Sequence, residues 1–163
     1  MAIKVVSNTG PLIHLSEIGL LNALEVFDKI YIPEEVKNEL ITNKIKEPRK
    51  VKILNLKAKF KDVAAILVDK FSLDLGEAEA IALALQEKAD YFLTDDLDAR
   101  TVANFHTLEA HGTVGIVLRA FRDKLISREI AIEKVWELYS VSSLFITKDL
   151  ISHVIASIQN FRK

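Results

Sequence analysis

The chain lacks several features that would restrict its class or its location. It has no cysteine, one methionine and three prolines, so disulfides and thiolate metal sites are excluded and a reducing compartment is the simplest setting. The longest uninterrupted apolar runs, residues 63–68 and 80–85, have six residues each, whereas a membrane-spanning helix needs about 20. The first seven residues lack the long apolar region of a signal peptide. We therefore expect a soluble, cytoplasmic protein with no membrane segment.

The chain does contain enough apolar material for a core. Half of its 163 residues are hydrophobic, and a chain of this length buries roughly 70% of the surface that its unfolded form exposes. Neither an internal repeat nor a Ser/Gly-rich linker divides the sequence. We expect one globular domain over residues 1–163.

Positive and negative charges are nearly balanced over the whole chain, but basic and acidic residues are concentrated in different segments. Residues 44–61 contain eight Lys or Arg and one acid, whereas residues 69–98 contain nine acids and two lysines. The simplest interpretation of the basic stretch is a solvated surface. The alternative is that the basic stretch forms a lip beside a metal site. Such a lip would attract the phosphates of a nucleic acid without contacting its bases specifically. Its candidate residues are Lys44, Lys46, Arg49 and Lys50.

Short apolar strand candidates alternate with helical patterns. The predicted strands are residues 3–7, 29–32 and 91–94; residues 51–56 are either a short strand or an irregular edge, and residues 107–111 are a candidate for one more strand. The predicted helices are residues 11–17, 20–26, 34–42, 60–71, 75–88 and 98–105, followed by three that begin near residues 113, 128 and 147. This alternation is typical of right-handed parallel crossovers, and it predicts an α/β fold, a three-layer α/β/α sandwich with a central parallel sheet. Sites in such folds lie at the carboxyl ends of the strands.

Four polar residues fall where that edge is expected. Asn8 and Asp96 each follow a predicted strand, although they are 88 positions apart. Glu39 lies at the margin of the apolar stripe of its helix, and Glu77 shares a helix face with apolar residues that follow it. A carboxylate on a buried face is costly unless it is paired, protonated or bound to a cation. A divalent metal site is therefore the functional hypothesis.

Each of these acids also has a simpler structural interpretation. Glu77 near a helix start can complement the helix dipole, Glu39 can be a solvated helix residue, and Asp96 can be an N-cap with Asp95 as its neighbour. The functional interpretation is that hard ions such as Mg²⁺ or Mn²⁺ bind to a few converging carboxylates. Such an ion supports hydrolysis of a phosphodiester bond.

Four motifs in order give the chain a family resemblance. They lie at residues 7–13 (SNTGPLI), at 32–40 (IPEEVKNEL), at 73–84 (LDLGEAEAIALA) and at 93–96 (LTDD). From about residue 3 to residue 122 the sequence resembles the PIN-domain family, and it is most similar to the VapC-like toxin branch. The resemblance implies a Mg²⁺- or Mn²⁺-dependent ribonuclease acting on RNA. It also implies a homodimer and pairing with an antitoxin protein.

The resemblance also implies roles for particular residues. Glu39, Glu77 and Asp96 correspond to the second, third and fourth acids of the family, and Asn8 stands where the family has its first aspartate. An amide there can offer a carbonyl oxygen to a cation or hydrogen-bond a water, but the site has one negative charge fewer. Asp98 corresponds to a further acid at the metal, and Glu79 is a rival to Glu77. The supporting residues are Thr9, Thr94 and Asp95.

Two other functions remain open from the sequence. The loss of charge at Asn8 favours a PIN-like module with weak or no catalysis that binds RNA or a protein partner. The pair Asp95 and Asp96 at a strand end could instead accept a phosphoryl group in a phosphoacceptor or phosphatase domain. The leading hypothesis is the nuclease.

Overall fold

The structure is a computed structural model that describes residues 2–162. The chain divides into two compact units, which are described separately. Unit 1 contains the residues up to Ile13 together with Phe27–Gly112, and unit 2 contains His14–Val26 and the residues from Thr113 onward. Both units therefore contain two separate segments of the chain.

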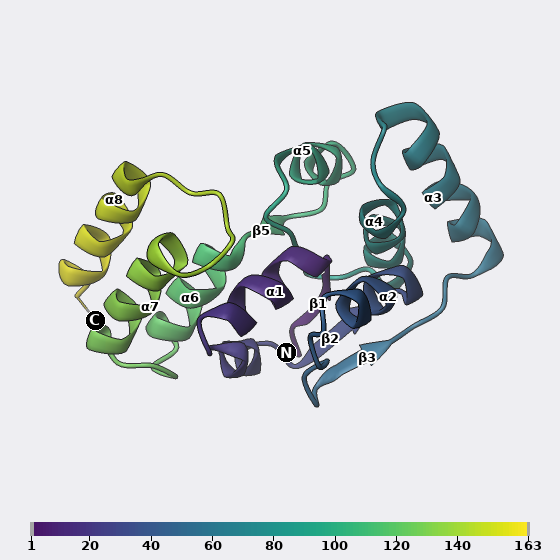
Figure 1. Cartoon of the computed structure of the whole chain (residues 1–163). Coiled ribbons are helices and arrows are strands. Elements are labelled where there is room, and N and C mark those ends of the chain that lie inside the picture. Colours follow the sequence, from purple (N-terminus) through teal and green to yellow (C-terminus); the bar gives the residue numbers. More distant parts are fainter. Residues whose placement is uncertain (1, 163) are drawn as a thin grey trace. The chain divides into compact units, whose positions relative to one another are not determined.

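Unit 1 is built on a sheet of five parallel strands in the order β3-β2-β1-β4-β5. The strands are β1 (Lys4–Ser7), β2 (Lys29–Ile32), β3 (Val51–Ile53), β4 (Tyr91–Leu93) and β5 (Ala110–His111). Val5 pairs with Ile30 on one side and with Tyr91 on the other. This sheet, with its flanking helices (Figure 1), confirms the predicted α/β class and the three-layer α/β/α sandwich.

Four helices lie wholly in unit 1. They are α2 (Glu34–Thr42), α3 (Ala58–Phe71), α4 (Leu75–Glu87) and α5 (Leu97–Phe105). Figure 1 shows α4 beside α2 and α3, and α4 also contacts the central strands β1 and β4. Its residues 80–84 are fully buried, and three of these five are alanines, whose small side chains let the helix approach the sheet closely. Because α4 is fixed in this way, its first turn has a defined place at the sheet edge.

The strand order creates a switch point in the middle of the sheet. From β1 the chain adds β2 and β3 on one side, and it later adds β4 and β5 on the other. The central strands are apolar and completely buried at Val5, Val6, Phe92 and Leu93, as strands covered on both faces require. In open parallel sheets, ligands bind outside the carboxyl ends of the strands at such a point. Here the residues that follow β1 and β4 meet there.

Unit 2 is helical. Its helices are the 3-10 helix η1 (Leu21–Val26), α6 (Thr113–Arg122), α7 (Arg128–Ser140) and α8 (Lys148–Gln159), and helix α1 (Thr9–Glu17) contains the boundary between the units. Ser127 and Thr147 cap α7 and α8 by accepting hydrogen bonds from the backbone N–H groups of Ile130 and Leu150. Helices α7 and α8 contact each other. In the part of the chain that the structure describes, no helix has the length and apolarity needed to cross a membrane.

Three sequence predictions need correction at the level of elements. The helix predicted over residues 20–26 is a short 3-10 helix over Leu21–Val26 and not an α-helix. The predicted strand over 51–56 ends at Ile53; Leu54 still donates its N–H to the carbonyl of Ile32, but residues 54–56 then leave the sheet. The strand predicted over 107–111 contains only Ala110 and His111, because Thr107 lies in a turn with a φ of 63°.

The basic loop between α2 and β3 is not at the edge where it was expected. Helix α2 starts after the carboxyl end of β2 and returns the chain to the amino end of the parallel strand β3. Lys44 ends this helix in the left-handed conformation, with a φ of 57°. Lys44, Lys46, Arg49 and Lys50 therefore lie at the edge where strands begin, opposite the carboxyl ends that carry the acids. They form no lip beside those acids, and their contact with nucleic acid stays a prediction.

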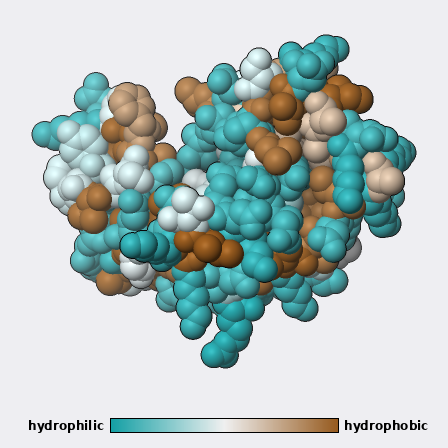
Figure 2. Space-filling model, turned by 45° about the vertical axis from the view of Figure 1, so that its right-hand side comes forward, coloured by the Kyte–Doolittle hydropathy of each residue, from teal (hydrophilic) through white to brown (hydrophobic). Residues whose placement is uncertain are grey.

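Large apolar side chains are also exposed at scattered positions of unit 1. Figure 2 shows apolar patches that interrupt a mainly hydrophilic face of the molecule. The large hydrophobic residues of unit 1 that are exposed are Ile41, Ile66, Leu75, Leu97 and Phe105. Two of them, Leu75 and Leu97, are the first residues of helices α4 and α5.

Candidate active site

Asn8 follows β1 directly and is buried, with 7% of its surface exposed. Its side-chain Oδ1 accepts a hydrogen bond from the Thr9 backbone N–H at 2.9 Å, and its Nδ2 donates to Thr94 Oγ1 at 3.3 Å. A backbone N–H can only donate, so the atom facing Thr9 must be the oxygen. The amide consequently turns its NH₂ group, not its carbonyl oxygen, toward Thr94.

Thr94 joins the ends of the two central strands. Its buried hydroxyl oxygen accepts hydrogen bonds from Asn8 Nδ2 and from the Asp96 backbone N–H, the latter at 3.1 Å. The Asn8 backbone N–H donates to the Leu93 carbonyl at 2.8 Å. These bonds fix the start of α1 against the start of α5 at the switch point.

Asp96 is the N-cap of α5, as one interpretation of the sequence predicted. Its Oδ2 accepts a hydrogen bond from the Ala99 backbone N–H at 2.8 Å. Its carboxylate also lies close enough to that of Glu77 to contribute to the raised pKa of Glu77. The capping role and a place in the acid cluster are therefore compatible.

Asp98 lies two residues further along the chain, exposed on the first turn of α5. It is not among the groups that shift the pKa of Glu77 or of Glu39. The structure therefore does not bring this predicted metal ligand into the cluster that the other acids form.

Glu77 is held by a reciprocal cap at the start of α4. The Asp74 side chain accepts from the Glu77 backbone N–H at 2.8 Å, and Glu77 Oε1 accepts from the Asp74 backbone N–H at 3.1 Å. The pKa of Glu77 is raised to about 7: burial is the largest cause, the negative charges of Asp74 and Asp96 also raise it, and the hydrogen bond from the Asp74 backbone lowers it. Glu77 thus holds a proton near neutral pH unless a cation offsets this charge.

Glu79 has a different role from Glu77. Its Oε1 accepts a hydrogen bond from the Glu35 backbone N–H at 3.2 Å, at the first turn of α2. Two residues on a helix point to different faces, and only Glu77 of this pair reaches Asp96. Glu77 therefore belongs to the cluster, whereas Glu79 accepts a hydrogen bond from a backbone N–H in the first turn of α2.

Glu39 reaches the cluster from α2 and lies against the first turn of α4. A Cβ atom built on Gly76 would be 1.8 Å from Glu39 Oε1, so the carboxylate occupies space that only glycine leaves open. Burial raises the pKa of Glu39, the Asp74 charge raises it further, and the Thr9 hydroxyl lowers it. Yet neither Thr9 Oγ1 nor Glu39 Oε1, both buried, completes a hydrogen bond with any group of residues 2–162.

The cluster carries negative charge that no basic side chain offsets. Among the described residues, Glu39, Asp74, Glu77 and Asp96 form no ion pair, and the charges that act on Glu39 and Glu77 are all acidic. The two unsatisfied oxygens of Thr9 and Glu39 add to this set. A hard divalent cation fits such oxygen donors by chemistry.

The side chains are not arranged as a complete metal cage. No group of three Asp, Glu or His side chains within residues 2–162 has the geometry to hold an ion. Mg²⁺ is usually bound through one or two carboxylates and keeps several waters. Glu77 and Asp96, which lie close together, are the pair that meets this requirement.

Replacement of Gly76 by alanine tests the position of Glu39. We expect Gly76→Ala to displace the Glu39 carboxylate, because the new methyl group would overlap Oε1, and to weaken Mn²⁺ binding by about tenfold, as for a lost supporting contact. Calorimetric titration with Mn²⁺ would measure the change.

The double variant Gly76→Ala with Glu39→Ala separates this effect from general damage. Residues that act through one contact are not additive, so the double variant should bind Mn²⁺ no more weakly than Glu39→Ala alone. Simple addition of the two losses would contradict a role of Gly76 through Glu39.

The neighbouring Asp95 points to a different contact. A Cβ atom on Gly112 would be 2.7 Å from both Asp95 Oδ1 and Arg100 Nη2, so these two side chains approach the same backbone position. Arg100 Nη2 also donates to the Thr94 carbonyl at 3.3 Å. Asp95 thus lies with Arg100 near β5, apart from the pair Glu77 and Asp96.

Sequence reasoning missed two residues of this site. Asp74 caps α4 and adds its charge to both Glu77 and Glu39, and its spacing of three residues before a glutamate is the signature of a capping box. Gly76 has no side chain and so leaves free the space that the Glu39 carboxylate occupies. No local signal identifies Gly76, because the contact joins two helices.

Fold and site together define an α/β protein with an acid cluster at the switch point of a parallel sheet. A family model described as a PIN domain matches residues 4–160. The chain therefore belongs to the PIN-domain family, whose members are in general metal-dependent nucleases. Among curated proteins, no relative matches the chain.

Proposed function

We propose that this protein is an endoribonuclease that requires Mg²⁺ or Mn²⁺ and hydrolyses phosphodiester bonds in RNA. The observation that carries the proposal is the approach of the Glu77 and Asp96 carboxylates at the switch point, where the pKa of Glu77 is raised to about 7 and no basic side chain among residues 2–162 forms an ion pair with either acid. Two acids held together in this way favour a bound cation. The membership in a family of nucleases supports the same conclusion.

Each residue has a defined task in this proposal. Glu77 and Asp96 would hold the ion, with Glu39 beside Thr9 on the α2 side, and Asp74 keeps Glu77 in place through the reciprocal cap. When bound, the ion supplies charge neutralisation at the phosphate and a nucleophilic water. Thr94 positions Asp96 through its backbone N–H. Asn8 acts as a hydrogen-bond donor to Thr94 and not as a ligand, since its NH₂ group faces that side.

A second candidate function follows from the same orientation of Asn8. Asn8 carries no charge, and its NH₂ group, not its carbonyl oxygen, faces Thr94. The cluster should therefore bind a cation more weakly than four carboxylates would. A PIN-like module that binds RNA or a protein partner without useful catalysis is therefore the alternative.

The cellular role is proposed from the motifs at residues 7–13, 32–40, 73–84 and 93–96. Their resemblance to the VapC-like branch supports a cytoplasmic toxin that forms a homodimer and is neutralised by an antitoxin protein. Lys44, Lys46, Arg49 and Lys50 would contact RNA away from the acid cluster, because their loop lies at the opposite edge of the sheet.

Incubation of the protein with mixed single-stranded and structured RNA in Mn²⁺ or Mg²⁺ tests the proposal. We expect internal cleavage that EDTA abolishes and that added Mn²⁺ restores, because the acids need a cation to act on a phosphate. RNA that is bound but remains intact under all these conditions would favour the binding module. Cleavage that persists in EDTA would contradict the metal-dependent mechanism.

A further inference from the structure

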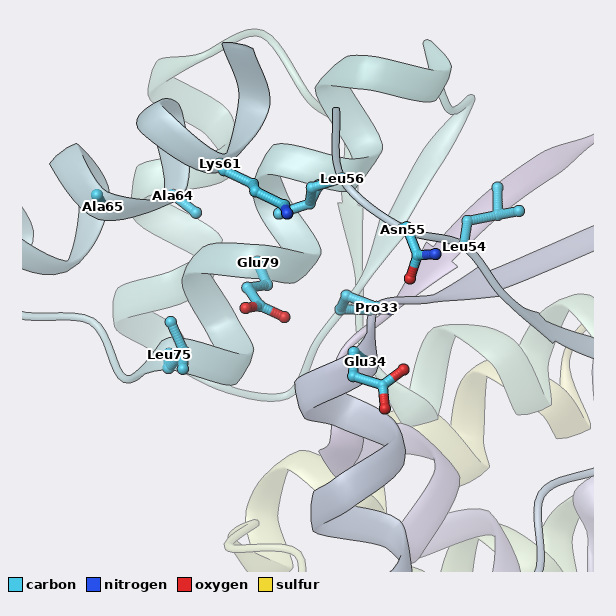
Figure 3. Close-up of a pocket in the computed structure, with 10 residues that line it drawn as sticks. All are labelled: Pro33, Glu34, Leu54, Asn55, Leu56, Lys61, Ala64, Ala65, Leu75 and Glu79. Carbon is cyan, nitrogen blue, oxygen red and sulfur yellow. The ribbon is translucent and has the colours of Figure 1, made fainter. Parts of the chain in front are cut away.

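A pocket lies on the same edge of the sheet as the acid cluster. It has a volume of about 610 Å³, within the range of about 300–1,000 Å³ that is typical of small-molecule sites. It is lined from α2, from the segment after β3, from α3 and from α4 (Figure 3). The lining residues that matter for its chemistry are Glu34, Asn55, Lys61, Ala65, Leu75 and Glu79.

The pocket and the acid cluster share two helices. Helix α4 gives Leu75 and Glu79 to the pocket and Glu77 to the cluster, while α2 gives Glu34 to the pocket and Glu39 to the cluster. The pocket lies beyond the ends of β2 and β3, and the cluster lies beyond the ends of β1 and β4. Two strand spacings separate these positions, roughly 10 Å. A short single strand of nucleic acid can span both.

The walls of the pocket are held in place by hydrogen bonds. The Gln86 side chain accepts from the Lys57 backbone N–H at 2.8 Å and donates to the Asn55 carbonyl at 3.3 Å, which ties the segment after β3 to α4. Glu79 ties α4 to the first turn of α2 through the Glu35 N–H. The pocket is therefore preformed, which lowers the ordering cost of binding a ligand.

The chemistry of the lining suits a nucleobase that carries an amino group. Leu54, Leu56 and Leu75 supply apolar surface for a flat ring, as in most small-ligand sites. Carboxylates accept hydrogen bonds when ionised, and Figure 3 shows that of Glu79 pointing toward Pro33, with Glu34 beyond Pro33 and its carboxylate turned away from Glu79. Adenine, cytosine and guanine each have an amino group that can donate to them. Uracil has no amino group: its one donor on the Watson–Crick edge, N3–H, lies between two carbonyl oxygens, which would face the acids whenever N3–H donates to one of them.

Lysines next to the pocket fit the backbone of the same ligand. Lys61 lines the pocket, and Lys57 and Lys59 are exposed at the start of α3. This basic group lies on the carboxyl-end side of β3, unlike the loop of residues 44–50. Ammonium groups contact phosphates without selecting a base.

We propose that this pocket binds an unpaired adenine, cytosine or guanine of the RNA close to the bond that is cleaved, and discriminates against uracil. The inference rests on the proposed ribonuclease function and extends it to the form of the substrate. A base can enter the pocket only when it is unstacked, so the nucleotide that binds there is unpaired. The acid cluster then acts on a phosphate near the bound base.

A binding experiment tests the pocket without any cleavage. The four ribonucleoside 5′-monophosphates are titrated into methyl-labelled protein in EDTA, and the methyl resonances of Leu54, Leu56, Leu75 and Ala65 are followed by NMR. We expect AMP, CMP or GMP to shift these resonances, and UMP to bind at least about tenfold more weakly, which corresponds to the loss of one good base contact. The absence of shifts with all four nucleotides, or equal binding of UMP, would overturn the inference.

The variant Ala65→Phe fills the pocket from α3, and Ala58→Phe is its control. Both alanines are exposed on that helix, but only Ala65 lines the pocket. Ala65→Phe should remove nucleotide binding and should abolish any preference among cleaved single-stranded RNAs that differ in the base beside the cut, whereas Ala58→Phe should keep both. An unchanged base preference in an active Ala65→Phe would refute the pocket while leaving the nuclease intact. Nucleotide binding by a protein that cleaves no RNA would support the pocket and reject the nuclease.

Discussion

Asp96→Asn is expected to reduce RNA cleavage by about 100-fold or more while the protein stays folded. Asparagine is as good an N-cap as aspartate, so the hydrogen bond from the Ala99 N–H to residue 96 can be kept. The charge beside Glu77 is lost, however, and a contribution of about 3 kcal/mol to charge stabilisation at the phosphate corresponds to about 100-fold in rate. Cleavage rates in Mn²⁺ and the melting temperature would be measured together.

The same variant gives a readout that does not depend on activity. The charge of Asp96 contributes to the raised pKa of Glu77, so Asp96→Asn should lower the pKa of Glu77 from about 7 toward the ordinary glutamate value. Carbon NMR of the labelled carboxyl group in EDTA would follow this titration. Asp149→Asn, which removes an exposed acid from the first turn of α8, is the matched control. Full cleavage activity in Asp96→Asn together with an unchanged Glu77 pKa would refute the site.

Asn8→Asp is expected to bind Mn²⁺ at least about tenfold more tightly than the wild type, because metal affinity rises with the number of charged ligands. The change is nearly isosteric. The oxygen facing Thr9 keeps its hydrogen bond, and the Thr94 hydroxyl can rotate to donate to the new carboxylate while it still accepts from the Asp96 N–H. Calorimetric titration with Mn²⁺ would measure affinity, and RNA cleavage would be compared at saturating metal.

Two controls make this result interpretable. Asn22→Asp adds the same charge at an exposed position of η1 and should leave Mn²⁺ binding unchanged. Asn8→Asp combined with Asp96→Asn should lose most of the gain if both residues act on one ion. Cleavage by the wild type and by Asn8→Asp would show that an amide suffices at this position. Cleavage by the variant alone would identify the natural protein as a binding module.

Much of the fold follows from local signals. The strands over residues 29–32 and 91–93 and the helix over 34–42 could be predicted because their apolar spacing and their starts are encoded in neighbouring residues. Segments without a strong period were predicted less well. Leu21–Val26 is a 3-10 helix, and residues 54–56 leave the sheet to line a pocket.

The acid cluster could be predicted in outline only. Asn8 and Asp96 follow strands, and parallel strands bring such positions to one edge. The choice between Glu77 and Glu79 could not be made from spacing, because it depends on the helix that each face of α4 meets. Glu79 meets the start of α2, whereas Glu77 meets Asp96. The position of the basic loop could not be predicted, because charge along the chain does not say to which edge a crossover returns.

The sequence by itself determined the succession of strands and helices along the chain and the candidate acids Glu39, Glu77 and Asp96, since these depend on residues a few positions apart. Only the tertiary structure decided that the Asn8 amide turns its NH₂ group toward Thr94, that Glu39 occupies the space above Gly76, and that burial and the neighbouring acids together raise the pKa of Glu77 to about 7. Each of these features depends on contacts between segments that are far apart in the chain, and on the removal of water that those contacts cause.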